Sequence, residues 1–201
     1  KCLKDVRASD WIAIQPGRAF GSTVQFPACP SKTFHRQIIP VIPLISADFF
    51  EWLGYLVGDG SISGDVVSYV VCAKDADVFK KLSKVTFGLK SGARVYRGVR
   101  ERRFTCALLA KWLRIAGYSK TAVPLVLDTA SNRMVAAFLR GLFEADGGVG
   151  RRSNGQRISF CSVNKGLALG VQVLLLRLGV HSSLRFCSNK CRGGWHVAVR
   201  A

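Results

Sequence analysis

The chain has 201 residues, of which 49% are hydrophobic, so it can bury a substantial core as one domain or as two fused halves. Its 30 Lys and Arg residues against 12 Asp and Glu residues give a net charge of +18, which favours a polyanionic partner. No apolar run reaches the length that a transmembrane helix needs, so we expect no membrane-spanning segment.

Residues 1–45 are predicted to form an irregular N-terminal extension. The stretch Asp10–Ile14 is typical of a short strand, and four prolines between positions 27 and 43 keep the following chain extended or looped. The first residues lack the layout of a signal peptide. Seven scattered cysteines, an odd number, favour free thiols in a reducing intracellular compartment.

Two elements are expected next. An apolar run predicts a helix over about residues 49–58, with Asp48 as its N-cap. Residues 61–72 then alternate as a β-hairpin does, with a turn at Gly64 and Asp65. These elements begin the first half of the body.

The first half continues with a helix, a hairpin and a helix. The next helix is expected to start at Asp75 and to end at Gly88. A second hairpin spans about residues 94–107, and a short amphipathic helix, 108–116, follows it. The first half therefore has the predicted order α-β-β-α-β-β-α.

The second half repeats this order. A helix is predicted over residues 132–145, a hairpin turning at Asn154 and Gly155, a helix over 165–178 and a last hairpin over 183–200. The final helix of the first half has no predicted counterpart in the second half. We predict an α+β fold of two repeats, 46–124 and 125–201, each αββαββ(α), after an extension over residues 1–45.

A nine-residue motif occurs once in each half, at the end of the leading helix. The copies are WLGYLVGDG, residues 52–60, and LRGLFEADG, residues 139–147. Each carries two small residues four positions apart, which share one helix face and permit close helix packing. These small residues are Gly54 and Gly58 in the first copy and Gly141 and Ala145 in the second.

An aspartate ends each copy, Asp59 in the first and Asp146 in the second. A carboxylate at a helix C-terminus opposes the helix dipole, so its repeated placement favours a functional role over a structural one. If the helices pair in parallel, the two acids meet. Two converging carboxylates suit a hard divalent cation such as Mg²⁺.

This duplicated motif resembles the LAGLIDADG homing endonucleases, although Val57 replaces a residue that is often acidic there. The resemblance implies saddle-shaped antiparallel sheets around paired central helices, in a monomer with internal pseudo-twofold symmetry. It implies site-specific cleavage of double-stranded DNA, with Asp59 and Asp146 as catalytic residues. The same two acids, with Gly58 and Ala145, would bind Mg²⁺ or Mn²⁺, or Ca²⁺ without turnover.

Lys120 is a further catalytic candidate. It lies in the segment Ser119–Pro124, which resembles a stretch in which the family places a lysine near the active centre. The alternative, a solvated loop lysine, remains open. The second half offers no symmetric counterpart, and Lys190 could substitute for one.

DNA contacts are expected from the hairpins, because a two-stranded ribbon fits the major groove. In the last strand, Trp195, Val197 and Val199 should face the core. The expected DNA-binding residues are Arg94, Arg97, Arg103, Arg151, Arg157, Arg185, Lys190, His196 and Arg200. The pattern alone does not separate arginines that read bases from those that hold phosphates.

Other interpretations remain open. No acidic residue follows Asp146, while nine Lys or Arg residues do, so DNA is favoured over a membrane surface. A catalytically silent protein of the same fold, such as an intron RNA maturase or a regulator, would not need both acids, and neither would a ribosome-associated protein. Residues 9–14 resemble the exit of an intein splicing domain, or form an ordinary strand. Cys187 and Cys191 lack the second ligand pair of a structural zinc site.

Overall fold

The computed structural model describes residues 46–152, 155–188 and 193–200. The predicted N-terminal strand, the intein-like segment, Asn154 and Lys190 lie outside these residues. None of the described helices is long and apolar enough to cross a membrane.

The described elements confirm the predicted repeat. The first half contains α1 (Ala47–Asp59), β1 (Gly60–Ser63), β2 (Val66–Cys72), α2 (Ala76–Leu82), β3 (Gly92–Tyr96), β4 (Val99–Thr105) and α3 (Ala107–Ile115). A short helix, α4 (Val126–Thr129), follows α3. The second half contains α5 (Asn132–Asp146), β5 (Gly147–Arg152), β6 (Gly155–Ser162), α6 (Lys165–Arg177), β7 (Ser182–Cys187) and β8 (Gly194–Arg200).

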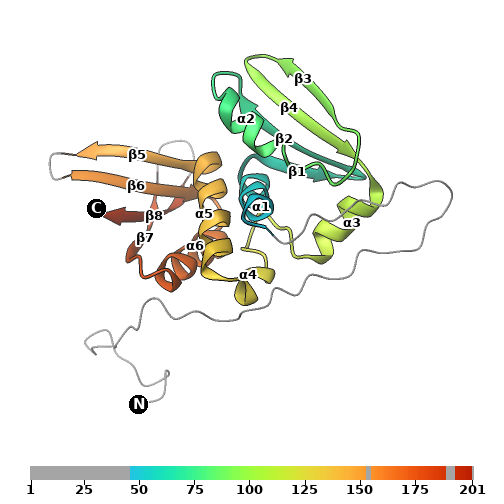
Figure 1. The fold of residues 1–201 in the computed structure, drawn as a ribbon. Helices are drawn as coiled ribbons and strands as arrows, with labels where there is room; N and C mark the ends of the chain where they lie inside the picture. Colours follow the sequence, from blue (N-terminus) through green and yellow to red (C-terminus); the bar gives the residue numbers. More distant parts are fainter. Residues whose placement is uncertain (1–45, 153–154, 189–192, 201) are drawn as a thin grey trace.

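Each half forms one antiparallel sheet, and the two sheets have the same strand order. The first sheet is β1-β2-β4-β3 and the second is β5-β6-β8-β7. The sheets lie on opposite sides of the central pair α1 and α5 (Figure 1). The α+β fold with two antiparallel sheets around paired helices is confirmed.

Only one face of each sheet packs against the core. In β2 and β4, Val67, Tyr69 and Phe104 are buried, while their sequence neighbours point to the other face. In the second sheet, Phe160 and Val197 have the same role, and the predicted packing of Trp195 and Val199 against the core is confirmed. We call the opposite faces the exposed faces of the two sheets.

Helices α1 and α5 contact each other through their backbones. A Cβ atom at Gly54 would overlap the carbonyl oxygen of Phe138 and lie 3.0 Å from the Leu142 nitrogen. A Cβ atom at Gly141 would overlap the Glu51 carbonyl oxygen in the same way. Because glycine alone permits this approach, the predicted small-residue stripe is the helix interface.

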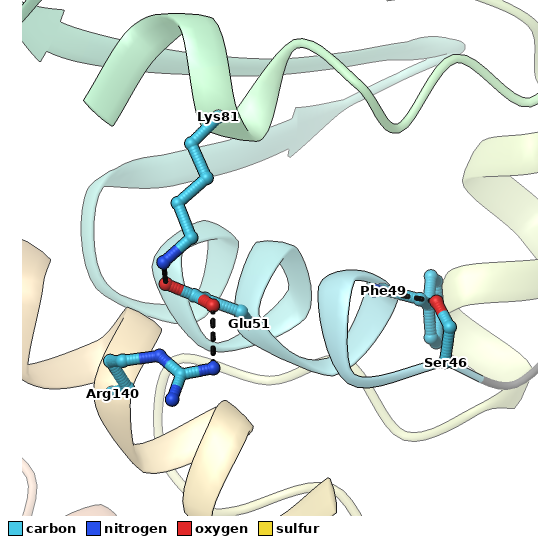
Figure 2. Close-up of polar contacts among 5 residues, drawn as sticks. All are labelled: Ser46, Phe49, Glu51, Lys81 and Arg140. Atoms are coloured by element: carbon cyan, nitrogen blue, oxygen red, sulfur yellow. Dashed lines mark hydrogen bonds and ion pairs between the residues drawn. The ribbon is translucent and has the colours of Figure 1, made fainter. Parts of the chain in front are cut away.

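Two predicted helix ends are wrong. Ser46, not Asp48, is the N-cap of α1, and its Oγ accepts a hydrogen bond from the Phe49 nitrogen at 3.2 Å (Figure 2). Asp48 lies in the first turn, where its charge also suits the helix dipole. Helix α2 ends at Leu82, well before Gly88, because the apolar residues that follow enter the core from an irregular segment.

A buried carboxylate joins the two halves. Glu51 of α1 is 5% exposed and pairs with Lys81 of α2 and, at 2.8 Å, with Arg140 of α5 (Figure 2). Burial alone would raise the pKa of Glu51, but Arg140 and Lys81 hold that pKa below its ordinary value. Glu51 is therefore ionised at neutral pH, and its pairing with Arg140 fixes how α1 and α5 sit against each other.

Candidate active site

The site lies where α1 and α5 end together. A Cβ atom at Gly58 would overlap the Ala145 side chain and lie 3.2 Å from Oδ2 of Asp146. Since Gly54 lies against Phe138 and Gly58 against Ala145, the helices run parallel and their last residues meet. Asp59 and Asp146 therefore converge as predicted, and both side chains are exposed to solvent.

The folded state destabilises the ionised form of both carboxylates. Partial burial and the charge of Asp146 raise the pKa of Asp59. Partial burial also raises the pKa of Asp146, and nearby Lys120 partly offsets both shifts. A divalent cation between them would relieve this repulsion, because it favours both ionised forms.

Lys120 lies beside both acids, in the loop between α3 and α4. Its Nζ donates to the carbonyl oxygens of Gly58 and, at 2.8 Å, of Val57 at the end of α1. A cation suits this end of the helix dipole. Burial lowers the pKa of Lys120, and the charges of Asp146 and Asp59 act against that shift.

A second-half residue supports the Lys120 loop. The Nδ2 of Asn164, which precedes α6, donates to the Lys120 carbonyl oxygen at 3.1 Å. The sequence carried no signal for this contact, because the two residues are far apart along the chain and belong to no shared motif. Asn164 thus positions a first-half loop from the second half.

The donor set fits a hard divalent cation. Carboxylate and carbonyl oxygens are the ligands that Mg²⁺ prefers, and the cation usually keeps several waters. The described residues contain no group of three or more His, Cys, Asp or Glu side chains that could hold a metal ion. Water or substrate phosphate would therefore have to complete the coordination of a cation held by Asp59 and Asp146.

Most of the predicted DNA-binding residues are on or beside the exposed faces. In the first sheet, strand register places Arg94 and Arg103 on the exposed face, and Arg97 lies in the β3–β4 turn with φ of 46°. The second sheet places Arg157, Arg185 and His196 on its exposed face. Arg151 and Arg200 belong to β5 and β8, and Lys190 lies outside the described residues.

Strand register also places Arg102 and Arg103, which are neighbours in β4, on opposite faces of the first sheet. Arg102 points to the core side, where its guanidinium donates to the Ser83 carbonyl oxygen at 3.0 Å and lies over the Phe104 ring. Glu101, which was not among the predicted site residues, lies on the exposed face beside Arg94 and Arg103. The position of Glu101 opposite Arg94 in the second hairpin was the feature from which its place in the site could have been predicted.

Comparison with known proteins agrees with this geometry. Residues 133–200 match the model of the LAGLIDADG-like domain. The structure superimposes on the homing endonuclease I-DmoI in complex with DNA and Ca with a TM-score of 0.52, at 18% identity, over 77% of this chain and 83% of that one. The chain has the two-repeat LAGLIDADG fold. Full-length DUF199/WhiA from Thermatoga maritima shares the fold at 9% identity, with a TM-score of 0.52 over 80% of this chain and 53% of that one.

The sequence relatives of this chain are much longer than it is. A DNA polymerase of Thermococcus sp. (strain GE8) is 31% identical over 154 residues, which are 70% of this chain and 9% of the polymerase. The replicative DNA helicase DnaB of Rhodothermus marinus is 30% identical over 183 residues, 78% of this chain and 19% of the helicase. The chain thus corresponds to a small part of each relative.

The raised pKa values lead to a stability prediction. A carboxyl group whose pKa is higher in the folded state destabilises that state when ionised, and this cost disappears as the pH falls below its ordinary value of about 3.9. We therefore expect Asp146→Asn to raise the melting temperature at neutral pH and to lose this advantage in acid. Mg²⁺ should raise the melting temperature of the unmodified protein more than that of the variant.

Calorimetry at several pH values, with and without Mg²⁺, would test this expectation. Asp128→Asn is the control, since Asp128 is an exposed aspartate of α4 away from the paired acids. Equal melting temperatures of Asp146→Asn and the unmodified protein at every pH would show that the ionised Asp146 carboxylate does not destabilise the folded state.

Proposed function

We propose that this protein is a site-specific endonuclease that cuts both strands of double-stranded DNA with the help of a divalent cation. The observation that carries the proposal is the meeting of Asp59 and Asp146 at the ends of paired helices, with Lys120 beside them. A protein that only binds nucleic acid has no need for two carboxylates whose charges repel each other and any phosphate nearby.

The chain's own residues suit phosphodiester hydrolysis. Asp59 and Asp146 would hold Mg²⁺, which would supply an activated water and neutralise charge on the phosphate, while the Gly58 carbonyl oxygen already accepts a hydrogen bond from Lys120. Water adds to phosphorus, one P–O bond to a sugar breaks, and the leaving oxygen takes up a proton. The ammonium group of Lys120 is placed to stabilise the charge that develops on the phosphate oxygens.

The two sheets would bind the DNA on either side of this centre. Each acid ends a helix of a different half, so each would serve one strand. The exposed faces carry different side chains in the two halves, for example Glu101 and Arg103 in the first and His196 in the second. We infer a long, asymmetric target that is bound by a single copy of the chain.

The relatives support an origin as an inserted element. A polymerase and a helicase share this stretch, although it makes up only 9% and 19% of their lengths. Insertion into host genes, as an intein or from an intron, accounts for this distribution. The free thiols of Cys72, Cys161 and Cys187 suit a reducing compartment of the cell.

A second candidate is a nucleic-acid-binding protein that no longer cuts. Its support is that WhiA, which is not named as an endonuclease, shares the fold. Retention of both acids favours the nuclease. A randomised DNA library incubated with the protein and Mg²⁺, followed by sequencing of the cut ends, would test the proposal. One enriched sequence cut on both strands is expected, whereas bound but uncut DNA would establish the second candidate.

Lys120 offers a test of the mechanism. We expect Lys120→Met to slow cutting by about 10²-fold to 10³-fold, the usual loss when one charge-stabilising donor is removed. Affinity for DNA should change little, because one of many cations is lost. Lys111→Met, which removes an exposed lysine of α3, serves as the control. An unchanged cutting rate for Lys120→Met would mean that Lys120 only caps α1.

A further inference from the structure

Glu101 is an acid on a surface that is otherwise built for a polyanion. It is the only acidic residue between Lys90 and Lys120, and it lies on the exposed face of the first sheet. It is nevertheless only 7% exposed, because the side chains around it cover it. An unpaired carboxylate here would repel DNA, so its presence calls for a specific use.

Two arginines hold this carboxylate. Oε2 of Glu101 accepts from Nε of Arg94, its direct partner across β3 and β4. Its Oε1 lies 3.9 Å from Nε of Arg103, two residues further along the same strand. The Arg94 guanidinium also lies over the Tyr96 ring, 4.6 Å from its centre. We call Arg94 and Arg103 the arginine pair, and Glu101 is its carboxylate.

The geometry leaves the arginines available to a ligand. The side chains of Arg94 and Arg103 are 58% and 45% exposed, while that of Glu101 is 9% exposed beneath them. Contact with the carboxylate and the tyrosine ring restricts the Arg94 rotamers before any ligand arrives. Such preorganisation lowers the entropy cost of binding in one fixed orientation.

The net charge of these three residues favours a base edge over a phosphate as their ligand. The arginine pair and its carboxylate carry a net charge of only +1, and the carboxylate repels a phosphate. Neutral acceptors on a base edge meet no such repulsion, and the O6 and N7 atoms of guanine match an arginine fork in the major groove. We propose that Arg94 and Arg103, oriented by Glu101, read guanine in the half of the target that lies under the first sheet.

The second sheet has the opposite arrangement. Strand register places Arg157, Arg185 and His196 on its exposed face, and no acidic residue follows Asp146 in the sequence. A face of unbalanced positive charge suits phosphates, whose binding releases counterions. The arginine pair of the first sheet would therefore specify the sequence, while Arg157 and Arg185 of the second sheet supply affinity that does not depend on sequence.

The proposal rests on the proposed function only in requiring that the protein binds DNA. The test uses the full chain with Ca²⁺ and a target selected by binding, not by cutting. Affinity is measured for this target, for a panel of single base-pair changes, and over a range of salt concentrations. Arg94→Lys keeps the charge and removes the fork, Glu101→Gln removes the carboxylate, and Arg185→Ala removes one cation of the second sheet.

We expect Arg94→Lys to lose about 10-fold to 100-fold of discrimination at one G·C pair while the salt dependence stays the same. Glu101→Gln should lose discrimination at that same pair and bind other sequences more tightly. Arg185→Ala should weaken binding to every sequence alike and reduce the salt slope by about one.

Two results would overturn the proposal. If Arg94→Lys keeps full discrimination at every base pair, the arginine does not read a base. If Glu101→Gln lowers the melting temperature but leaves discrimination intact, the carboxylate only stabilises the hairpin. Absence of DNA binding by the unmodified protein would instead refute the proposed function, so the two failures are distinguishable.

Discussion

Asp59→Asn and Asp146→Asn are each expected to abolish double-strand cutting while DNA binding persists. Asparagine keeps the size of the side chain but lacks the negative charge that holds a divalent cation. With one acid serving each strand, loss of either should slow cutting by about 10³-fold or more. Relaxation and linearisation of a supercoiled plasmid that carries the target would measure the two strand cuts separately.

Two comparisons make this result interpretable. Glu144→Gln is the control, because Glu144 is an exposed acid of α5 only two residues before Asp146. The Asn variants should be at least as stable as the unmodified protein, since the paired carboxylates have raised pKa values. Loss of cutting would then not come from misfolding. Full activity of both Asn variants would show that the site is elsewhere.

The helices and their small-residue faces could be predicted because the signals are local, and the convergence of the acids followed from parallel pairing of the two motif copies. The spacing of Gly54 and Gly58 places both on one helix face, and the second copy repeats it. The pairing of β1 with β2 and of β3 with β4 also follows from short hairpins, whose two strands are neighbours in sequence, whereas the central pairing of β2 with β4 does not. These features need only a few consecutive residues to specify them.

Contacts between distant residues could not be predicted in the same way. The partners of Lys120 include Val57 and Asn164, which belong to other elements of the fold. Similarly, Glu51 is a helix acid like many others until Arg140 is placed beside it. The end of α2 was misplaced because the periodic apolar residues after Leu82 pack into the core without helical structure.

The helix interface predicts a large effect of adding a single methyl group. In Gly54→Ala, the new Cβ would overlap the Phe138 carbonyl oxygen and lie 2.9 Å from the carbonyl carbon. Backbone atoms cannot rotate away, so α1 and α5 must separate. Overpacking of this kind costs about 3 kcal/mol, and the better helix propensity of alanine returns about 1 kcal/mol. We expect a net loss of about 2 kcal/mol in the free energy of unfolding.

Chemical denaturation would measure this loss, and Gly170→Ala is a matched control. Gly170 is also helical, but a Cβ atom there would meet the side chain of Val123 at 2.8 Å, and a side chain can adjust. Both variants gain the same helix propensity, so their difference isolates the backbone contact. A Gly54→Ala protein as stable as the control would contradict the close packing of α1 and α5.

Because the same helices carry Asp59 and Asp146, Gly54→Ala should also slow cutting at temperatures where it remains folded. This result would link the spacing of the helices to the position of the acids.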